Sequence, residues 1–246
     1  MARIISFISR KGGSGKTTTC ANVAAALAKR GRKVLVMDLD PQQSLSKSLA
    51  GPSILDGKFI EPQADLDQQL NRLPKDPQVF QADYLLIDCP PSLDDIAIAA
   101  AYVSHLVVIP TGTSRMDLMA TGETLTAVRQ IRDRRKGVHP VIAIQPTRVQ
   151  PGTGVSKTIE AELPELLLEG EQDQTTPGWA LVLPKIALRS IFAQSFDFSE
   201  TAMDSEPPSS KAAQEINRVT DRIETVLMPM EKYHDLEPLK GDAAHG

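Results

Sequence analysis

Aromatic side chains and cysteines are both scarce in this chain. Phe, Trp and Tyr make up 4% of the 246 residues, so a buried core has to be built mainly from aliphatic side chains. That composition is usual in parallel sheets whose two faces are covered by helices. The cysteines, Cys20 and Cys89, have no C-x-x-C spacing, which argues against a disulfide framework and against a metal or cluster site. Two such thiols suit a reducing cytoplasm.

Excess positive charge and long apolar runs are also lacking. The formal net charge is −4, whereas a protein that binds DNA through its overall charge is usually basic. Any contact with DNA must therefore come from a local patch, and we expect two subunits to form it together. The longest apolar runs have the length of strands, so the sequence predicts no signal peptide and no membrane-spanning segment.

The proportions of hydrophobic and charged residues, 41% and 24%, suit one large folded domain. We place this domain at residues 1–228 and expect the polar residues 229–246 to form a disordered tail. Strand-like runs alternate with helix-like segments, one of them at residues 155–168. This alternation predicts an α/β fold with a mainly parallel sheet and helices on both faces. Residues 51–80 are broken up by Gly and Pro and predict one short helix, at residues 65–73.

The strongest local signal is a Gly-rich stretch between an apolar run, residues 4–8, and an Ala-rich helical pattern. A strand, a Gly-rich turn and a helix that begins with Lys-Thr are typical of a phosphate-binding P-loop. Glycines let backbone N–H groups approach phosphates, and the helix N-terminus adds partial positive charge. Lys16 is expected to reach the β- and γ-phosphates and Thr17 to hold Mg²⁺. The alternative is a Gly-rich turn that merely begins a helix. The predicted phosphate-binding residues are Gly12, Gly13, Ser14, Gly15, Lys16, Thr17 and Thr18.

Acidic residues follow two further predicted strands. Asp38 and Asp40 end the strand at residues 33–37, and alternation sends their side chains to the same side of the chain. The carboxyl ends of parallel strands are where ligands bind in such sheets, and acids there can position the waters of a Mg²⁺–phosphate site. Asp40 is also expected to cap the next helix, with Pro41 at its first position. Asp88 ends the strand at residues 84–87 and is expected to hold Mg²⁺ through water. Ser92 is expected to cap the helix that follows.

A second lysine, Lys11, precedes the P-loop lysine by five residues, and an ordinary P-loop does not need it. With this lysine the sequence resembles the deviant Walker ATPases of the ParA/MinD family, whose loop reads K-G-G-x-G-K-T-[ST]. The sequences D-x-D-P-Q at residues 38–42 and D-C-P-P at residues 88–91 match two further motifs of that family. The resemblance covers nearly the whole chain and implies the same twisted, helix-flanked parallel sheet.

The resemblance also implies roles for individual residues. Lys11 would reach across a dimer interface to the ATP of the other subunit, Asp40 would orient the hydrolytic water, and Asp38 would support the water shell of Mg²⁺. Arg148 lies in a turn that the family often has near the adenine. The cofactors implied are ATP and Mg²⁺, and the implied catalytic residues are Lys11, Lys16 and Asp40.

The function implied is that of a ParA-type ATPase in the cytoplasm, on the nucleoid. An ATP-bound homodimer would bind DNA without sequence preference and position a cargo, such as a plasmid, a chromosome locus or a carboxysome. A cargo-bound adaptor would stimulate slow hydrolysis. Arg189 would face DNA by resemblance, although Ala187 replaces the family's usual proline. Lys211, Arg218 and Arg222 form a basic stripe on the last predicted helix, with Glu215 between them. The alternative is a solvated helix face with local ion pairs.

Other interpretations stay open at this point. A MinD-like membrane-cycling regulator needs a C-terminal amphipathic helix, but Pro229 interrupts residues 227–232 and acids follow it. A metabolic or electron-transfer enzyme of related fold would use cysteines at a dimer axis, a position unsuited to Cys20 and Cys89. The basic residues 132–136 are either a nucleic-acid patch or cations that complement a helix C-terminus.

Overall fold

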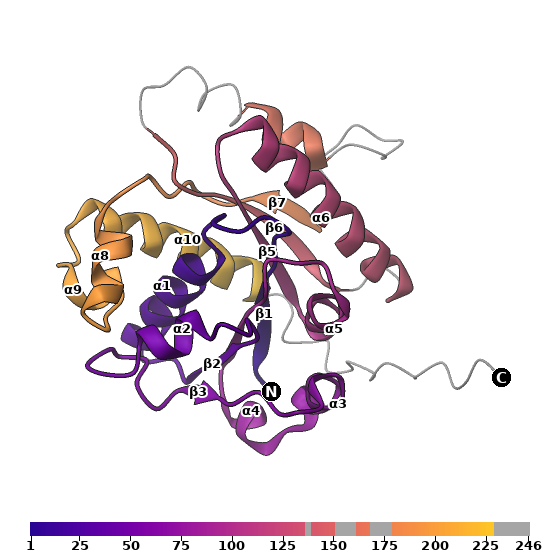
Figure 1. Ribbon diagram of the computed structural model, residues 1–246, viewed down its shortest axis with the longest axis horizontal. Helices are drawn as coiled ribbons and strands as arrows, with labels where there is room; N and C mark the ends of the chain where they lie inside the picture. Colours follow the sequence, from indigo (N-terminus) through magenta and orange to yellow (C-terminus); the bar gives the residue numbers. More distant parts are fainter. Residues whose placement is uncertain (136–138, 151–160, 168–178, 229–246) are drawn as a thin grey trace.

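The computed structural model describes residues 1–135, 139–150, 161–167 and 179–228 (Figure 1). In this part of the chain, seven strands form one sheet in the order β3-β2-β4-β1-β5-β6-β7, and every neighbouring pair is parallel. The predicted α/β fold with a parallel sheet is therefore confirmed. The predicted tail at residues 229–246 lies outside the described residues, as does half of the predicted helix at 155–168, of which residues 161–167 are helical.

The strands are short, and all except the two edge strands are almost wholly buried. Alternation along β1 sends Ile5 and Phe7 into one core and Ile4 into the other, with the following residue Ile8 on that second side. Residues 51–80 contain β3, a two-residue edge strand that the sequence did not predict. The strands are β1 (Arg3–Phe7), β2 (Val34–Asp38), β3 (Phe59–Ile60), β4 (Tyr84–Asp88), β5 (Leu106–Thr111), β6 (Val141–Pro146) and β7 (Ala180–Val182).

Helices form a layer on each face of the sheet (Figure 1). On one face lie α1 (Lys16–Lys29), α2 (Ser44–Ser48), α8 (Ile191–Asp197), α9 (Ala202–Ser205) and α10 (Lys211–Leu227). On the other lie α3 (Leu66–Arg72), the 3₁₀ turn η1 (Leu73–Lys75), α4 (Pro77–Gln81), α5 (Asp95–Val103), α6 (Arg115–Arg134) and residues 161–167. The predicted short helix at 65–73 corresponds to α3, with Asp65 as its N-cap.

Two predicted helix caps are wrong. Asp94, not Ser92, caps α5, because the Asp94 carboxylate accepts from the Ala97 N–H while Ser92 donates its hydroxyl proton to Asp94. Likewise α2 begins only at Ser44, so Asp40 is too far from its N-terminus to cap it. In both cases an aspartate two residues from the predicted cap accepts the amides at the start of the helix: Asp94 at α5 and Asp38 at α2.

The last helix packs as its apolar spacing predicts. Ala212, Ile216, Val219, Ile223 and Leu227 are all buried, and α10 packs beside α1. No helix in the described ranges is both long and apolar enough to cross a bilayer. The free thiols of Cys20 and Cys89 are fully buried, and burial raises the pKa of each well above its usual value.

The basic residues that end α6 bind the protein's own backbone. Arg132 donates to the Pro140 carbonyl, and Arg135 donates to the carbonyls of Tyr102 and Ser104. These contacts favour a structural role over a nucleic-acid patch, although the carbonyls belong to the end of α5 and to residue 140 rather than to the end of α6. Lys136 lies outside the described residues.

Candidate functional site

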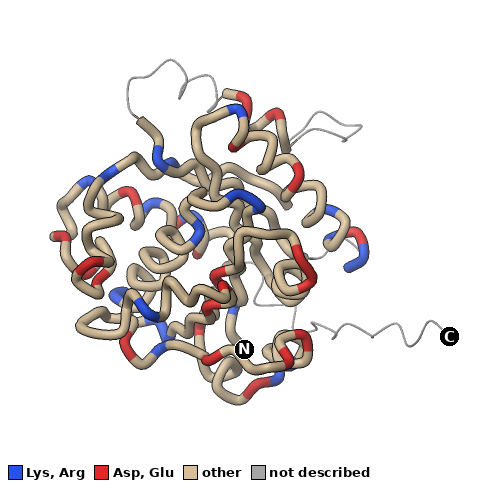
Figure 2. Tube along the Cα trace, in the orientation of Figure 1, with Lys and Arg blue, Asp and Glu red and all other residues tan. Residues whose placement is uncertain are grey.

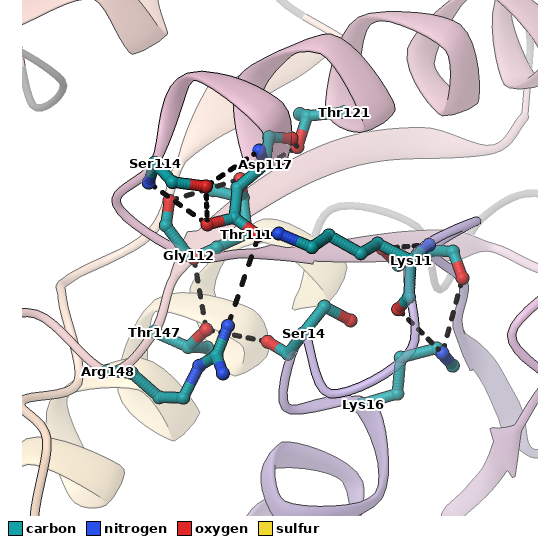
Figure 3. Close-up of polar contacts among 11 residues, drawn as sticks. Lys11, Ser14, Lys16, Thr111, Gly112, Ser114, Asp117, Thr121, Thr147 and Arg148 are labelled. Atoms are coloured by element: carbon teal, nitrogen blue, oxygen red, sulfur yellow. Dashed lines mark hydrogen bonds and ion pairs between the residues drawn. The ribbon is translucent and has the colours of Figure 1, made fainter.

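The Gly-rich loop connects the central strand β1 to α1. Gly13 and Gly15 have φ angles of 69° and 95°, in the left-handed region that favours glycine. A Cβ on Gly15 would also lie 3.3–3.4 Å from the side chain of Thr147, so this position has little room for any other residue. The Thr147 hydroxyl donates to the Ser14 carbonyl at 2.7 Å and so ties the loop to the end of β6 (Figure 3).

Lys16 occupies the inside of this loop. Its Nζ donates to the carbonyl oxygens of Ser9, at 3.2 Å, and of Lys11, at 3.4 Å (Figure 3). Burial lowers the pKa of Lys16, and the neighbouring Asp88, Cys89 and Asp40 oppose that shift. A cation held against carbonyls can exchange them for phosphate oxygens, which are the stronger partners.

A cleft of about 510 Å³ opens over the loop. Its floor is formed by the Gly-rich loop and the first residues of α1, with Asp40 at one side and Arg148 at another. Apolar side chains form another wall of the cleft: Ile186, Leu188, Phe192, Phe196 and Ile216. A floor of amides and cations beside an apolar wall suits a ligand with phosphates at one end and an aromatic base at the other.

Asp88 lies at the carboxyl end of β4, in register with Asp38 on β2. Burial raises the pKa of the Asp88 carboxyl to about 7. Asp38 adds to this rise, while a hydrogen bond from Thr17 and the charge of Lys16 oppose it. Asp88 Oδ1 has no hydrogen-bond partner among the described residues. A buried carboxylate oxygen without a partner, beside a hydroxyl, is the kind of oxygen donor set that Mg²⁺ takes. The residues present therefore fit a magnesium ion.

Asp38 and Asp40 differ in their surroundings. The carboxylate of Asp38 accepts the backbone N–H groups of Asp40, Leu45 and Ser46 at 3.0–3.1 Å, so it is Asp38 that meets the amides at the start of α2. Burial raises the pKa of Asp38, and these three hydrogen bonds oppose the rise. Asp40 accepts from the Gln42 N–H through Oδ1 and lines the cleft. Of the two acids, Asp40 is the one that faces the cleft.

Lys11 points away from its own loop, toward α6. Its Nζ lies 2.5 Å from Asp117 Oδ1, and Arg148 Nη2 lies 4.0 Å from the same oxygen (Figure 3). Sequence reasoning missed Asp117. The pattern Ser114-x-x-Asp117 was visible in the sequence, and it forms a capping box at the start of α6. Such a pattern predicts where a helix begins, but it does not predict a contact with a loop about a hundred residues away.

The four cations predicted to bind DNA fall into two groups. Arg189 donates to Glu215 Oε1 at 2.6 Å and lines the cleft. Glu215 is buried, so the prediction that it lies on an exposed basic stripe is wrong. Lys211, Arg218 and Arg222 are exposed on α10, and no ion pair joins them to another described residue. Figure 2 shows basic and acidic residues interspersed along the trace rather than separated.

A family model described as the CobQ/CobB/MinD/ParA nucleotide binding domain matches residues 5–232. The chain belongs to this family. The resemblance drawn from the loop sequence is thereby confirmed, and the ParA/MinD members of this family are ATPases.

Relatives support the same assignment. An uncharacterised protein of Mycobacterium tuberculosis is 28% identical over 202 residues, and the match spans 67% of this chain and 64% of the relative. The chain thus covers less than two thirds of that relative's length. The chromosome-partitioning ATPase Soj of Thermus thermophilus is 28% identical over 190 residues, which are 65% of this chain and 75% of Soj.

Solved structures share the fold. Cyanothece McdA in complex with ATP superposes with a TM-score of 0.68 at 18% identity and covers 92% of this chain and 96% of its own. Cobyrinic acid a,c-diamide synthase of Mycobacterium smegmatis, with bound ADP and magnesium, gives 0.66 at 21% identity and covers 94% and 98%. The cofactors expected from the sequence, ATP and Mg²⁺, are thus of the kind bound in structures of this fold.

Proposed function

We propose that this protein is a ParA-type ATPase that positions a cargo on DNA. The proposal rests on the different positions of the two lysines of the loop. Lys16 is buried and fills the inside of the loop, whereas Lys11 is partly exposed and extends away from it. An ordinary phosphate loop needs only the first lysine. We propose that the second serves a triphosphate outside its own subunit, in a homodimer with ATP between the subunits.

The residues around the cleft supply the chemistry of hydrolysis. The loop amides of residues 12–18 and Lys16 bind the phosphates, and Lys11 of each subunit adds positive charge to the partner's triphosphate. Asp40 faces the cleft and orients the attacking water. Thr17 and Asp88 hold Mg²⁺, with Asp38 supporting its waters, and the ion, when bound, offsets phosphate charge. Arg148 and the apolar wall contact the base.

Hydrolysis then acts as a timer. ATP favours the dimer because it contacts both subunits, so it shifts the population toward that state. The dimer aligns two sets of cations, the exposed Lys211, Arg218 and Arg222 and the half-buried Arg189, and binds DNA backbone without sequence preference. Hydrolysis separates the subunits, and an adaptor on the cargo stimulates that step. The names of the relatives support this proposal, since Soj is a chromosome-partitioning ATPase and McdA maintains carboxysome distribution. The cycle places the protein in the cytoplasm, on the nucleoid, with no membrane partner.

A DNA-retention assay with ADP, ATP and a non-hydrolysable ATP analogue tests this function. We expect retention with ATP and the analogue and none with ADP, with sedimentation showing a dimer under the same two conditions. The same mass with all three nucleotides would reject the ATP-dependent dimer. A dimer without retention would leave the nucleotide switch standing but remove DNA as its partner.

A further inference from the structure

Asp117 has no role in the proposed hydrolysis, although hydrogen bonds hold its side chain in a defined position. Its side chain is 6% exposed, against 34% for Lys11 and 45% for Arg148. Oδ2 accepts from the Ser114 N–H at 3.0 Å and from the Ser114 hydroxyl at 2.6 Å, while Oδ1 accepts from Lys11 (Figure 3). The start of α6 thus holds the carboxylate in place. The more exposed side chains of Lys11 and Arg148 are the groups that can move.

The Asp117 carboxylate stays ionised at neutral pH. Burial by itself would raise the pKa of Asp117, but hydrogen bonds from Lys11 and Ser114 outweigh it and hold the pKa below its usual value. Removing one partner of a buried ion pair is strongly destabilising, because it leaves the remaining charge poorly compensated. Lys11 can therefore leave Asp117 readily only if another cation takes its place. Arg148 Nη2 is 4.0 Å from the same oxygen, so a small movement would make that replacement.

We propose that Asp117 is the resting counter-ion of Lys11, and that Arg148 takes over the carboxylate when Lys11 moves to a triphosphate. The inference rests on the proposed function, because it assumes that Lys11 serves the partner subunit. Asp117 then acts as a positioning residue: it keeps Lys11 off the phosphates until a second subunit arrives. Because Arg148 also lines the nucleotide cleft, a bound nucleotide and the released lysine act on the same arginine.

A capping role alone does not account for these contacts. α9 begins with the same kind of capping box, in which Asp204 accepts from the N–H and hydroxyl of Thr201. The remaining partners of Asp204 are Ser53 and the Ile54 N–H, which carry no charge. A capping acid in this protein can thus be satisfied without cations, and Asp204 provides a matched control for Asp117.

Asp117→Asn removes the charge and keeps the shape of the side chain. With the non-hydrolysable ATP analogue, sedimentation at increasing protein concentration should show the variant dimerising at about tenfold lower concentration than the wild type, the effect of losing one charged hydrogen bond. Asp204→Asn should match the wild type. Lys11→Ala should dimerise no better when Asp117→Asn is added, because the pair is already broken. Dimerisation of Asp117→Asn equal to or weaker than that of the wild type would overturn the proposal.

A second measurement tests the resting pair without any dimer. Mild acetylation of the nucleotide-free protein, read by mass spectrometry, should modify Lys11 several-fold faster in Asp117→Asn than in the wild type, since a charge-paired amine is protected. Ser114→Ala removes a hydrogen bond to the Asp117 carboxylate but keeps the carboxylate, so it should raise the acetylation rate of Lys11 by a smaller factor. This variant tests the counter-ion role if Asp117→Asn does not fold. Equal rates in all proteins would refute the counter-ion role. A wild type that stays monomeric with the analogue, but shows the expected rates, would instead reject the proposed function.

Discussion

The two lysines of the Gly-rich loop show how far single residues follow from a motif. Spacing alone predicted that Lys16 belongs to the loop, because its hydrogen-bond partners are close neighbours in sequence. The partner of Lys11 could not be predicted in that way. Asp117 comes from α6, and only the parallel order of β1 and β5 brings that helix beside the loop.

Lys16→Ala should abolish nucleotide binding, because the variant loses the charged hydrogen bonds from Nζ to phosphate. Each such bond contributes about 1.5–3 kcal/mol, so we expect affinity for ATP to fall at least tenfold to hundredfold. Isothermal titration calorimetry measures this directly. Lys29→Ala, which removes a lysine from the far end of α1, is the control and should bind ATP normally. ATP affinity retained by the Lys16 variant would refute the assignment of the site.

Asp40→Ala should bind ATP and remain dimeric, but hydrolyse it about 10²–10⁴-fold more slowly, because the proposed function assigns the orientation of the attacking water to Asp40. Phosphate release and sedimentation with ATP, measured side by side, separate binding from turnover. Asp56→Ala provides a control acid outside the cleft lining. If the Asp40 variant turns over at the normal rate, the catalytic assignment of Asp40 is wrong.

At the scale of elements, α10 is both a packing helix and a support for the cleft. Its apolar spacing predicted the buried face correctly, because burial of one face is a local property of an amphipathic helix. Its polar contacts were not predictable. Glu215 accepts from the Ala187 N–H and from Arg189, and so anchors the wall at residues 186–189, a contact that depends on where the loop after β7 runs.

Glu215→Gln should weaken binding of ATP and ADP several-fold and leave binding of inorganic tripolyphosphate unchanged, because in the proposed site the apolar wall contacts the base and the loop binds the phosphates. Glu224→Gln is the matched control. It breaks a similar pair on the same helix, with Arg30 and Arg32, away from the cleft. An equal loss of affinity for ATP and for tripolyphosphate would mean that Glu215 supports the fold as a whole rather than the apolar wall of the cleft.

DNA binding is best tested on α10 as well. Arg218→Glu and Arg222→Glu change exposed residues without a described ion pair, so reduced DNA retention with unchanged ATP binding would assign the patch. Arg189→Glu is a poorer test, since it places a second acid against the buried Glu215 and disturbs the cleft wall. Undiminished retention in the α10 variants would move the DNA surface elsewhere.

At the scale of the whole molecule, the alternation of strands and helices predicted the architecture, because a parallel sheet needs a crossover between strands. The edge strand β3 escaped prediction, since two residues carry no periodicity. The contact between two buried histidines was not predicted either. His105 and His139 are far apart in sequence but lie edge to face, with ring centroids 5.3 Å apart.

These histidines should make the fold sensitive to acid. Burial, together with His139, Arg135, Arg3 and the chain N-terminus, lowers the pKa of His105 to about 3, and burial with Arg135 and Arg132 lowers that of His139 to about 4. An unfolded histidine titrates near 6.5, so between pH 6.5 and 4 the unfolded chain binds more protons and the free energy of unfolding falls as pH falls. Each histidine contributes about 1.4 kcal/mol per pH unit within that window.

Urea unfolding at pH 7, 6 and 5 measures this effect. His139→Phe keeps an aromatic ring in place and removes one titrating group, so its stability should fall less steeply with acid than that of the wild type. Parallel curves for the two proteins would exclude His139 as a source of the acid sensitivity.

The buried thiols have a practical consequence. Cys20 and Cys89 are closed off from solvent, and their raised pKa values leave almost no thiolate to react with maleimide reagents at neutral pH. A fluorophore directed at one newly introduced surface cysteine would therefore report on that position alone. The subunit exchange of single molecules can be followed in a protein that keeps every native residue around its cleft.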